Sequence, residues 1–249
     1  MSQSFQQTEA RRIAYDQTEG RGPGVVFLGG FKSDKEGTKA RYLEQWAQRR
    51  GRAYLRFDYS GHGQSSGDFL DGSLTDWAED AAAIIGNLTS GRQILVGSSM
   101  GAWIALLIAR EMTDRVAGLV TIAGAPDFTE DKLWDGLSAG QRRQLLKSGQ
   151  IALPSDYSEE PYVITRHLIE DGRKRLVLRS SIPLPFPVRI LHGTVDMDVD
   201  MSVSLRLLEQ AQGDDIQLTL VKGADHRFSN PECLALIVNA IEDVTARSV

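Results

Sequence analysis

Short runs of hydrophobic residues alternate along the chain with longer segments in which hydrophobic residues recur every three or four positions. The short runs are rich in Val, Ile and Leu, which predicts strands covered by helices on both faces. They lie at 25–28, 53–57, 93–96, 116–122, 188–191 and 216–221, and an antiparallel edge strand is expected at 11–15. The longer segments have the spacing of amphipathic helices. They span 38–50, 74–88, 101–112, 202–212 and 232–246. This order predicts an α/β protein with a mostly parallel central sheet flanked by helices.

One stretch interrupts the alternation. Two helical patterns, at about 130–148 and 158–172, occupy it, and the run Leu176–Leu178 is its one convincing strand candidate. It ends in a segment with three prolines, which exclude a helix there. We therefore expect a few helices inserted into the sheet domain. The predicted division is a core of residues 1–126 and 187–249 and a helical cap of residues 127–186.

A candidate nucleophile lies directly after the run at 93–96. The segment Gly97-Ser98-Ser99-Met100-Gly101 fits G-x-S-x-G, and a helical pattern follows it. In this motif the serine occupies a strained turn between a strand and a helix, and the residues two positions before and after it must be very small. Both are glycine around Ser99, so we predict Ser99 as the nucleophile. Around Ser98 they are Val96 and Met100, which favours a packing role for Ser98.

A serine hydroxyl needs a neighbouring base, and histidine suits this role. In proteins with this motif the chain order is Ser, then Asp or Glu, then His. His226 follows the last predicted strand and precedes the final helix, at the sheet edge where catalytic groups gather. The other histidines favour structural roles, since His62 precedes the serine, His167 lies in the insertion and His192 ends a strand.

The acid that orients the histidine is expected after the preceding strand. Asp196 lies in the loop that follows 188–191, and an aspartate there would fix the tautomer of the histidine. Asp198 and Asp200 are rivals a few residues on, and the spacing of the turn favours Asp196.

Acyl transfer also needs N–H groups that stabilise an oxyanion. The backbone N–H after the nucleophile, that of Met100, is one candidate. The other is the N–H of Phe31, in the glycine-containing loop after the strand at 25–28. Because glycine has no side chain, Gly29 and Gly30 would allow this loop to approach the substrate closely.

The composition of the chain argues against several other classes of function and site. The 249 residues carry a net charge of −5, so the surface offers no basic footprint for nucleic acid. A single cysteine excludes an intrachain disulfide, and no cluster of cysteines and histidines indicates a metal or a cofactor. No run reaches the length needed for stable membrane insertion. The polar first residues show no secretory signal, so we expect a cytoplasmic protein.

The segment RFDYSGHGQS at 56–65 resembles the D-x-x-G-x-G-x-S loop of the α/β-hydrolase superfamily. Four further segments resemble a mitochondrial family of this superfamily that comprises palmitoyl-protein thioesterases and acyl-glucuronide esterases. They are GTKA at 37–40, ILVGSSMGAW at 94–103, PSDYSEE at 154–160 and DHR at 225–227. This resemblance implies the α/β-hydrolase fold, a small helical cap, no metal, no cofactor, and a triad carried over onto Ser99, Asp196 and His226.

The chain departs from the family pattern at several places. Phe31 stands where a tyrosine is expected, and Met100 and Ala102 replace a leucine and a glycine. No obvious mitochondrial presequence is present. These changes leave the chemistry intact but leave the preferred substrate open.

The resemblance implies a serine hydrolase that cleaves esters or thioesters through an acyl-enzyme, as an acyl-protein thioesterase or an acyl-glucuronide-type esterase. A carboxylesterase or lactonase for small esters is the alternative within enzymes, and a non-catalytic ligand-binding protein is the alternative from another class. The expected partner is a small-molecule or acylated-protein substrate, and the sequence leaves the oligomeric state open. The cap is expected to fold over the nucleophile and roof an apolar pocket, because it carries several apolar side chains. These are Leu133, Trp134, Leu137, Leu145 and Leu146.

Overall fold

The computed structural model describes residues 4–7, 11–154 and 161–248. Its main sheet has eight strands in the order β1-β2-β4-β3-β5-β6-β10-β12. The strands are β1 Ser4–Gln7, β2 Arg12–Thr18, β3 Arg21–Leu28, β4 Arg52–Phe57, β5 Gln93–Ser98, β6 Val116–Ile122, β10 Val188–Gly193 and β12 Ile216–Val221. From β4 to β12 all neighbours are parallel, while β1 and β2 are antiparallel at one edge. The predicted α/β fold is confirmed, and β1 adds an edge strand that the pattern did not predict.

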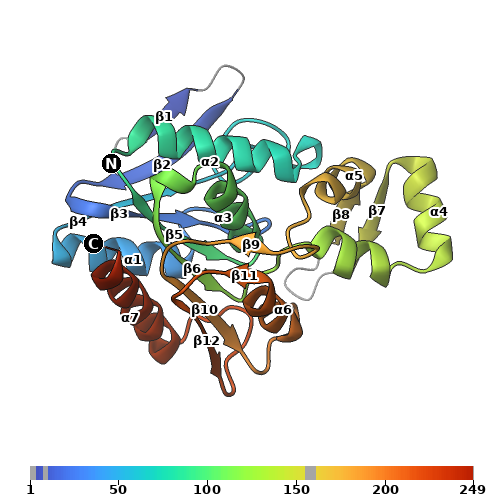
Figure 1. Ribbon diagram of the computed structural model, residues 1–249. Coiled ribbons are helices and arrows are strands. Elements are labelled where there is room, and N and C mark those ends of the chain that lie inside the picture. The colour runs from blue at the N-terminus through green and yellow to red at the C-terminus, as the bar shows by residue number, and fades with distance from the viewer. Residues whose placement is uncertain (1–3, 8–10, 155–160, 249) are drawn as a thin grey trace.

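Helices cover both faces of this sheet (Figure 1). The main helices of the core are α1 Thr38–Arg50, α2 Leu74–Leu88, α3 Met100–Glu111, α6 Ser202–Gln210 and α7 Pro231–Arg247. One hydrophobic core joins the sheet to α2, α3 and α6, and includes the buried side chains of Trp77, Trp103 and Leu207. A second core joins the other face to α1 and α7 through Leu43 and Ile237. Short elements complete this part: η1 Phe69–Asp71, η2 Thr113–Arg115, β9 Ile182–Pro183 and β11 Ala211–Gln212.

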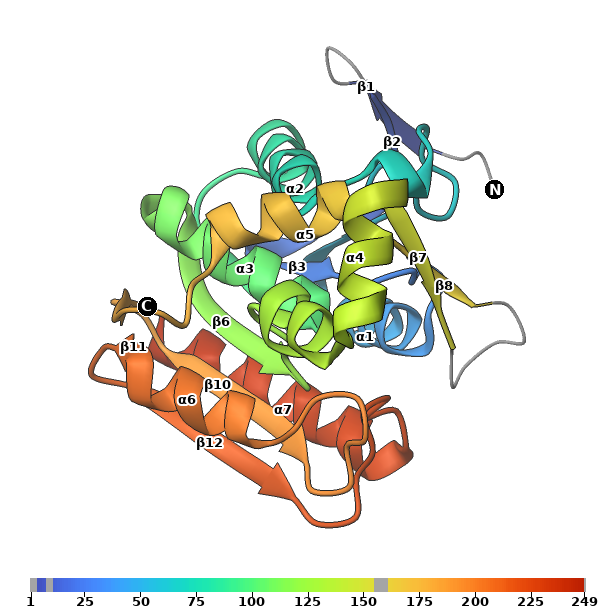
Figure 2. The ribbon, with the colours of Figure 1, turned by 90° about the vertical axis from the view of Figure 1, so that its right-hand side faces the viewer.

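The insertion lies to one side of the sheet domain, at the right of Figure 1, and faces the viewer in Figure 2. It contains η3 Thr129–Trp134, α4 Ala139–Ser148, β7 Gln150–Leu153, β8 Tyr162–Thr165, α5 Arg166–Gly172 and η4 Arg173–Arg175. The antiparallel pair of β7 and β8 was not predicted, because two four-residue strands are too short to show a clear alternation. In the described part of the pattern at 158–172, Tyr162–Thr165 form β8 and Arg166–Gly172 form α5. Residues 155–160, which hold most of the segment PSDYSEE, lie outside the described residues.

The buried carboxylate of Asp127 connects the two ends of the insertion. Asp127, at its start, accepts hydrogen bonds from the N–H groups of Val177 at 2.8 Å and Leu178 at 3.0 Å, near its end. The guanidinium of Arg179 lies 3.5 Å from the same carboxylate. The strand predicted at Leu176–Leu178 is therefore wrong, since this backbone turns around Asp127 instead of pairing with a strand.

Among the described helices, none combines the length and the hydrophobicity that crossing a membrane would require.

Candidate active site

Ser99 occupies the turn between β5 and α3, with φ 54° and ψ −120°. This left-handed backbone is rare for a residue with a side chain. The close approach of strand and helix explains the flanking glycines: a Cβ on Gly97 would lie 2.5 Å from the carbonyl oxygen of Gly101, and one on Gly101 would lie 2.1 Å from that of Leu28. The G-x-S-x-G segment therefore has the strand–turn–helix context that the motif requires. Ser98 is the last residue of β5 and is buried.

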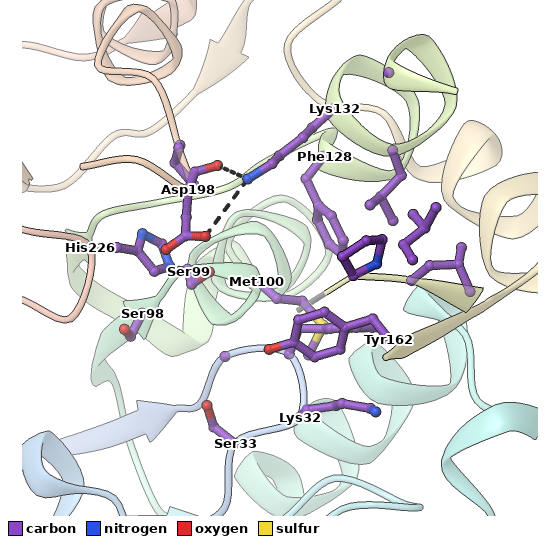
Figure 3. A pocket seen from close by; sticks show the side chains of 18 of the residues that line it. Lys32, Ser33, Ser98, Ser99, Met100, Phe128, Lys132, Tyr162, Asp198 and His226 are labelled. Atoms are coloured by element: carbon purple, nitrogen blue, oxygen red, sulfur yellow. Dashed lines mark hydrogen bonds and ion pairs between the residues drawn. The ribbon is translucent and has the colours of Figure 1, made fainter. Parts of the chain in front are cut away.

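The loops after three parallel strands bring Ser99, His226 and Asp196 into one line of contacts. His226 Nε2 lies 3.1 Å from Ser99 Oγ, and His226 Nδ1 lies 2.8 Å from Asp196 Oδ2. Figure 3 shows the imidazole beside Ser99. A carboxylate only accepts hydrogen bonds, so Nδ1 carries the proton and Nε2 presents its lone pair to the serine hydroxyl.

The carboxylate of Asp196 is held on both oxygens. Its Oδ1 accepts hydrogen bonds from the backbone N–H groups of Asp198 at 2.9 Å and Val199 at 2.8 Å. Burial would raise the pKa of Asp196, but the hydrogen bonds from His226 and from these N–H groups outweigh burial and hold the pKa below its ordinary value. Asp196 is therefore ionised at neutral pH, as stabilising an imidazolium requires.

The rival acids have other contacts. Lys132 of η3 donates to the backbone carbonyl of Asp198, and its ammonium lies 3.9 Å from the Asp198 carboxylate (Figure 3). Asp200 accepts from the N–H of Ser202 at 2.8 Å and is exposed. The carboxylate that contacts His226 Nδ1, at 2.8 Å, is that of Asp196.

Two of the other histidines lie away from Ser99. His167 is exposed on α5. His192 is fully buried and hydrogen-bonded, with Nε2 2.9 Å from the carbonyl oxygen of Val199 and Nδ1 2.7 Å from Ser204 Oγ. His192 thus supports the loop that carries Asp196.

The loop after β3 runs beside the nucleophile. A Cβ on Gly30 would lie 3.3 Å from the Cβ of Ser99, so only glycine fits without displacing the serine. The N–H of Phe31, the next residue, has no hydrogen-bond acceptor among the described residues. Met100 is the first residue of α3, where a backbone N–H has no partner inside the helix. Both N–H groups are thus available to an oxyanion, and their assignment stays a prediction.

A pocket of about 580 Å³ opens at Ser99 and His226, between the core and the insertion. Its walls are partly apolar, with contributions from both parts. The apolar lining includes Phe31 and Met100 from the core and Phe128, Leu133, Leu137, Leu153 and Ile164 from the insertion. Residues of the insertion thus line the pocket that opens at Ser99.

Three of the cap side chains expected in this roof do not line the pocket. The Trp134 ring packs against the guanidinium groups of Arg142 and Arg173, at 5.0 and 4.3 Å. Leu145 is buried in the cap's own small core, and Leu146 is 47% exposed. The helical pattern located these residues on the insertion but could not show which of them face the pocket.

Sequence reasoning missed Lys39, the second residue of α1, which lines the pocket. Its ammonium donates to the carbonyl oxygen of Arg227, next to His226. Burial lowers the pKa of Lys39 to about 8, although the Asp225 carboxylate opposes this shift. A cation in the first turn of a helix faces the positive end of the helix dipole, so this position is unfavourable without such a contact. Lys39 lies within the segment GTKA, and no local sequence pattern links it to the histidine loop.

Asp196, Asp198 and His226 each offer one ligand atom, and these atoms lie within 4.8 Å of one another. The hydrogen bonds described above already occupy both oxygens of Asp196 and one nitrogen of His226. A metal ion would have to replace these bonds, so we assign no metal to this group.

Comparison with known proteins gives consistent results. The model of the family described as "Alpha/beta hydrolase family" matches residues 25–234. The bovine protein named palmitoyl-protein thioesterase ABHD10, mitochondrial, is 35% identical over 93% of this chain and 76% of its own length. Among solved structures, a putative hydrolase from Agrobacterium vitis S4 has a TM-score of 0.93 at 40% identity and 98% coverage of both chains. The mouse alpha/beta hydrolase domain-containing protein 10 also has a TM-score of 0.93, at 31% identity and 100% coverage of both chains.

The names of the curated relatives correct one expectation. The bovine, rat and human proteins are all named mitochondrial, which contradicts the predicted cytoplasmic location. That prediction is therefore wrong. It rested on the lack of an apolar secretory segment, which by itself identifies no compartment.

Proposed function

The chain belongs to the alpha/beta hydrolase family and is a hydrolase of ester bonds, and on this premise we propose that it is an acyl-protein thioesterase with Ser99, His226 and Asp196 as its catalytic triad. The observation that carries the proposal is the unbroken contact from Asp196 through His226 to Ser99. Ser99, the last residue in this series of contacts, borders a partly apolar pocket that is large enough for an acyl group.

In the acylation step, Ser99 Oγ attacks the carbonyl carbon of the thioester and its proton passes to His226 Nε2. The negative charge that forms on the carbonyl oxygen is stabilised by the N–H groups of Phe31 and Met100. Asp196 stabilises the imidazolium without taking its proton. The C–S bond then breaks, and His226 returns the proton to the departing thiolate. The acyl group remains on Ser99 as an ester.

Hydrolysis of this ester repeats the sequence with water. His226 Nε2 takes a proton from a water molecule, the resulting hydroxide attacks the acyl carbon, and the same two N–H groups hold the second oxyanion. Collapse releases the carboxylic acid, and the proton on His226 returns to Ser99 Oγ. One thioester and one water thus give one acid and one thiol.

The substrate class rests on the pocket and on the relatives. Leu133, Leu137 and Ile164 give the roof of the pocket an apolar surface that suits an acyl chain. The bovine and human relatives are named palmitoyl-protein thioesterases, which favours acylated proteins. A glucuronide ester of the same acyl group would present the same carbonyl to Ser99.

The test combines active-site labelling with a substrate panel. A fluorophosphonate should label wild-type protein on Ser99, leave Ser99→Ala unlabelled, and still label Ser98→Ala. Acyl thioesters and p-nitrophenyl esters of graded chain length should then be compared by kcat/KM, with long-chain thioesters expected as the best substrates. Best turnover of the short esters would favour the carboxylesterase alternative. No labelling together with ligand binding would favour the non-catalytic alternative.

A further inference from the structure

His62 is a buried histidine that the proposed mechanism does not use. It is 3% exposed. It lies among aromatic rings, with its centroid 5.1 Å from those of Phe69 and Trp77 and 5.6 Å from that of Tyr59. Burying a polar ring in such surroundings destabilises the folded protein unless both ring nitrogens are hydrogen-bonded.

Both nitrogens have partners, and the partners select one form of the ring. Nδ1 lies 3.1 Å from the carbonyl oxygen of Ser60, which can only accept. Nε2 lies 3.3 Å from the backbone nitrogen of Lys32, which can only donate. His62 must therefore carry its proton on Nδ1 and accept at Nε2. Burial lowers the pKa of His62, which keeps this neutral form at neutral pH.

The residue that His62 holds is strained. Lys32 has φ 56°, in the left-handed region that a residue with a side chain rarely adopts. Such a backbone persists only where its surroundings hold it in place. Lys32 directly follows Phe31, whose N–H the proposed mechanism uses for the oxyanion. The Lys32 N–H belongs to the peptide that joins Phe31 to Lys32, so its hydrogen bond to His62 fixes one side of Phe31 and limits rotation of the adjacent peptide, which carries the Phe31 N–H.

A second, weaker contact holds the other side of the same loop. Tyr59 Oη lies 3.4 Å from the carbonyl oxygen of Gly29. Tyr59 and His62 both come from the segment RFDYSGHGQS, after β4, and both contact the loop after β3. Two side chains of this segment thus hold the loop of residues 29–32 by hydrogen bonds to Gly29 and Lys32.

We propose that His62 is a positioning residue for the oxyanion loop: by accepting the Lys32 N–H at Nε2, it holds Lys32 in its left-handed conformation and aims the Phe31 N–H at the reacting carbonyl. The inference rests on the proposed function, since it assumes that Phe31 donates to an oxyanion. His62 itself touches no reacting atom.

Two substitutions that differ by one methylene group test this role. In His62→Gln the side-chain amide reaches the position of Nε2 and can accept from Lys32. In His62→Asn it reaches only the position of Nδ1, which preserves the contact with Ser60 but leaves the Lys32 N–H without an acceptor. Both variants bury a neutral amide, so thermal unfolding of both controls for a purely structural effect.

We expect kcat of His62→Asn to fall by at least about tenfold. This loss should be smaller than the factor of about 10²–10³ that follows removal of a whole oxyanion donor. KM should change little, because the ground-state carbonyl needs the oxyanion contacts less than the transition state does. A trifluoromethyl ketone with a matched acyl chain forms an oxyanion on Ser99, and its Ki should rise in parallel with the loss in kcat. His62→Gln should recover most of both quantities.

Equal kcat and Ki for the two variants at equal thermal stability would overturn the inference, as would a loss confined to KM. If His62→Asn does not fold, His62→Gln still tests it, since loss of kcat in a stable Gln variant contradicts a role as acceptor. Failure of the proposed function gives a different result, because wild-type protein would then take no fluorophosphonate label on Ser99.

Discussion

Replacing Asp196 by asparagine tests the triad assignment most directly, because it removes a charge without changing the size of the side chain. The carboxylate accepts hydrogen bonds from two backbone N–H groups on Oδ1 and from His226 on Oδ2. An amide has one oxygen that accepts and one NH₂ group that donates. Asparagine therefore cannot satisfy all three donors, and its orientation decides what happens to His226.

The structure favours one orientation of the amide. With its oxygen in the place of Oδ1, both backbone N–H groups keep their acceptor. The reverse orientation would leave two buried N–H groups facing an NH₂ donor, at about 1–3 kcal/mol each, or about 2–6 kcal/mol together. The favoured orientation points the NH₂ group at His226 Nδ1, which must then accept. The histidine proton moves to Nε2, where it faces Ser99 and can no longer accept the serine proton.

We therefore expect Asp196→Asn to lower kcat by about 10⁴, the loss known for a triad aspartate in another serine hydrolase. This corresponds to about 5.4 kcal/mol in the activation free energy. The assay is release of thiol from a long-chain acyl thioester at saturating substrate, with thermal unfolding measured in parallel.

Asp198→Asn is the matched control, because it removes a neighbouring carboxylate and keeps the backbone N–H that Asp196 accepts. It should retain most of its activity. If Asp196→Asn lost less than about tenfold, or less than Asp198→Asn, the tautomer argument and the choice of acid would both be refuted.

Three further predictions follow from the site. Ser99→Ala should leave only the residual turnover that binding and the oxyanion hole supply, while Ser98→Ala stays active; similar kcat in both variants would contradict the elbow assignment. Leu137→Ala enlarges the pocket and should lower kcat/KM about tenfold or more for long acyl chains, and less for short ones. Leu146 is half-exposed and does not line the pocket, so Leu146→Ala should affect long and short acyl chains equally. Lys39 releases its proton at about pH 8 in the folded chain and near 10.5 in the unfolded chain, so its titration raises the unfolding free energy as pH rises between these values. Urea denaturation across that range should show that Lys39→Met lacks this rise, and parallel curves would exclude the shifted pKa.

The sequence predicts those parts of the fold and the site that depend on local signals. Most of the parallel strands follow from nearly continuous apolar runs, because strands buried on both faces contain few polar residues, whereas the edge strand β12 alternates and is only partly buried. The candidates Ser99, Asp196 and His226 follow from their positions at strand ends, because parallel strands bring their carboxyl ends to the same edge.

Contacts between segments that lie far apart in the chain could not be predicted from the sequence. His62 and Lys32 are 30 residues apart, and Lys132 and Asp198 are 66 apart, so no periodicity links either pair. Trp134 was assigned to the pocket because it is apolar, yet its ring packs on two guanidinium groups. The direction of a single side chain depends on its neighbours in the folded chain, which helical spacing does not specify.

The carboxylate of Asp127 has a consequence for how this fold can diversify. It ties the backbone at Val177 and Leu178 to the point where the insertion begins, so a stretch of some fifty residues starts and ends at one place on the sheet domain. The inner elements of the insertion also bind the core, since Asp171 accepts from Thr75 and the carbonyl oxygen of Arg175 accepts from Trp103, so exchange is confined to the outer part, around α4. A segment of another length or sequence in place of α4 would leave these contacts and the strand ends that carry Ser99, Asp196 and His226 unchanged, while it alters the side chains that reach the pocket. Substrate preference could then evolve, or be engineered, separately from the hydrolytic chemistry.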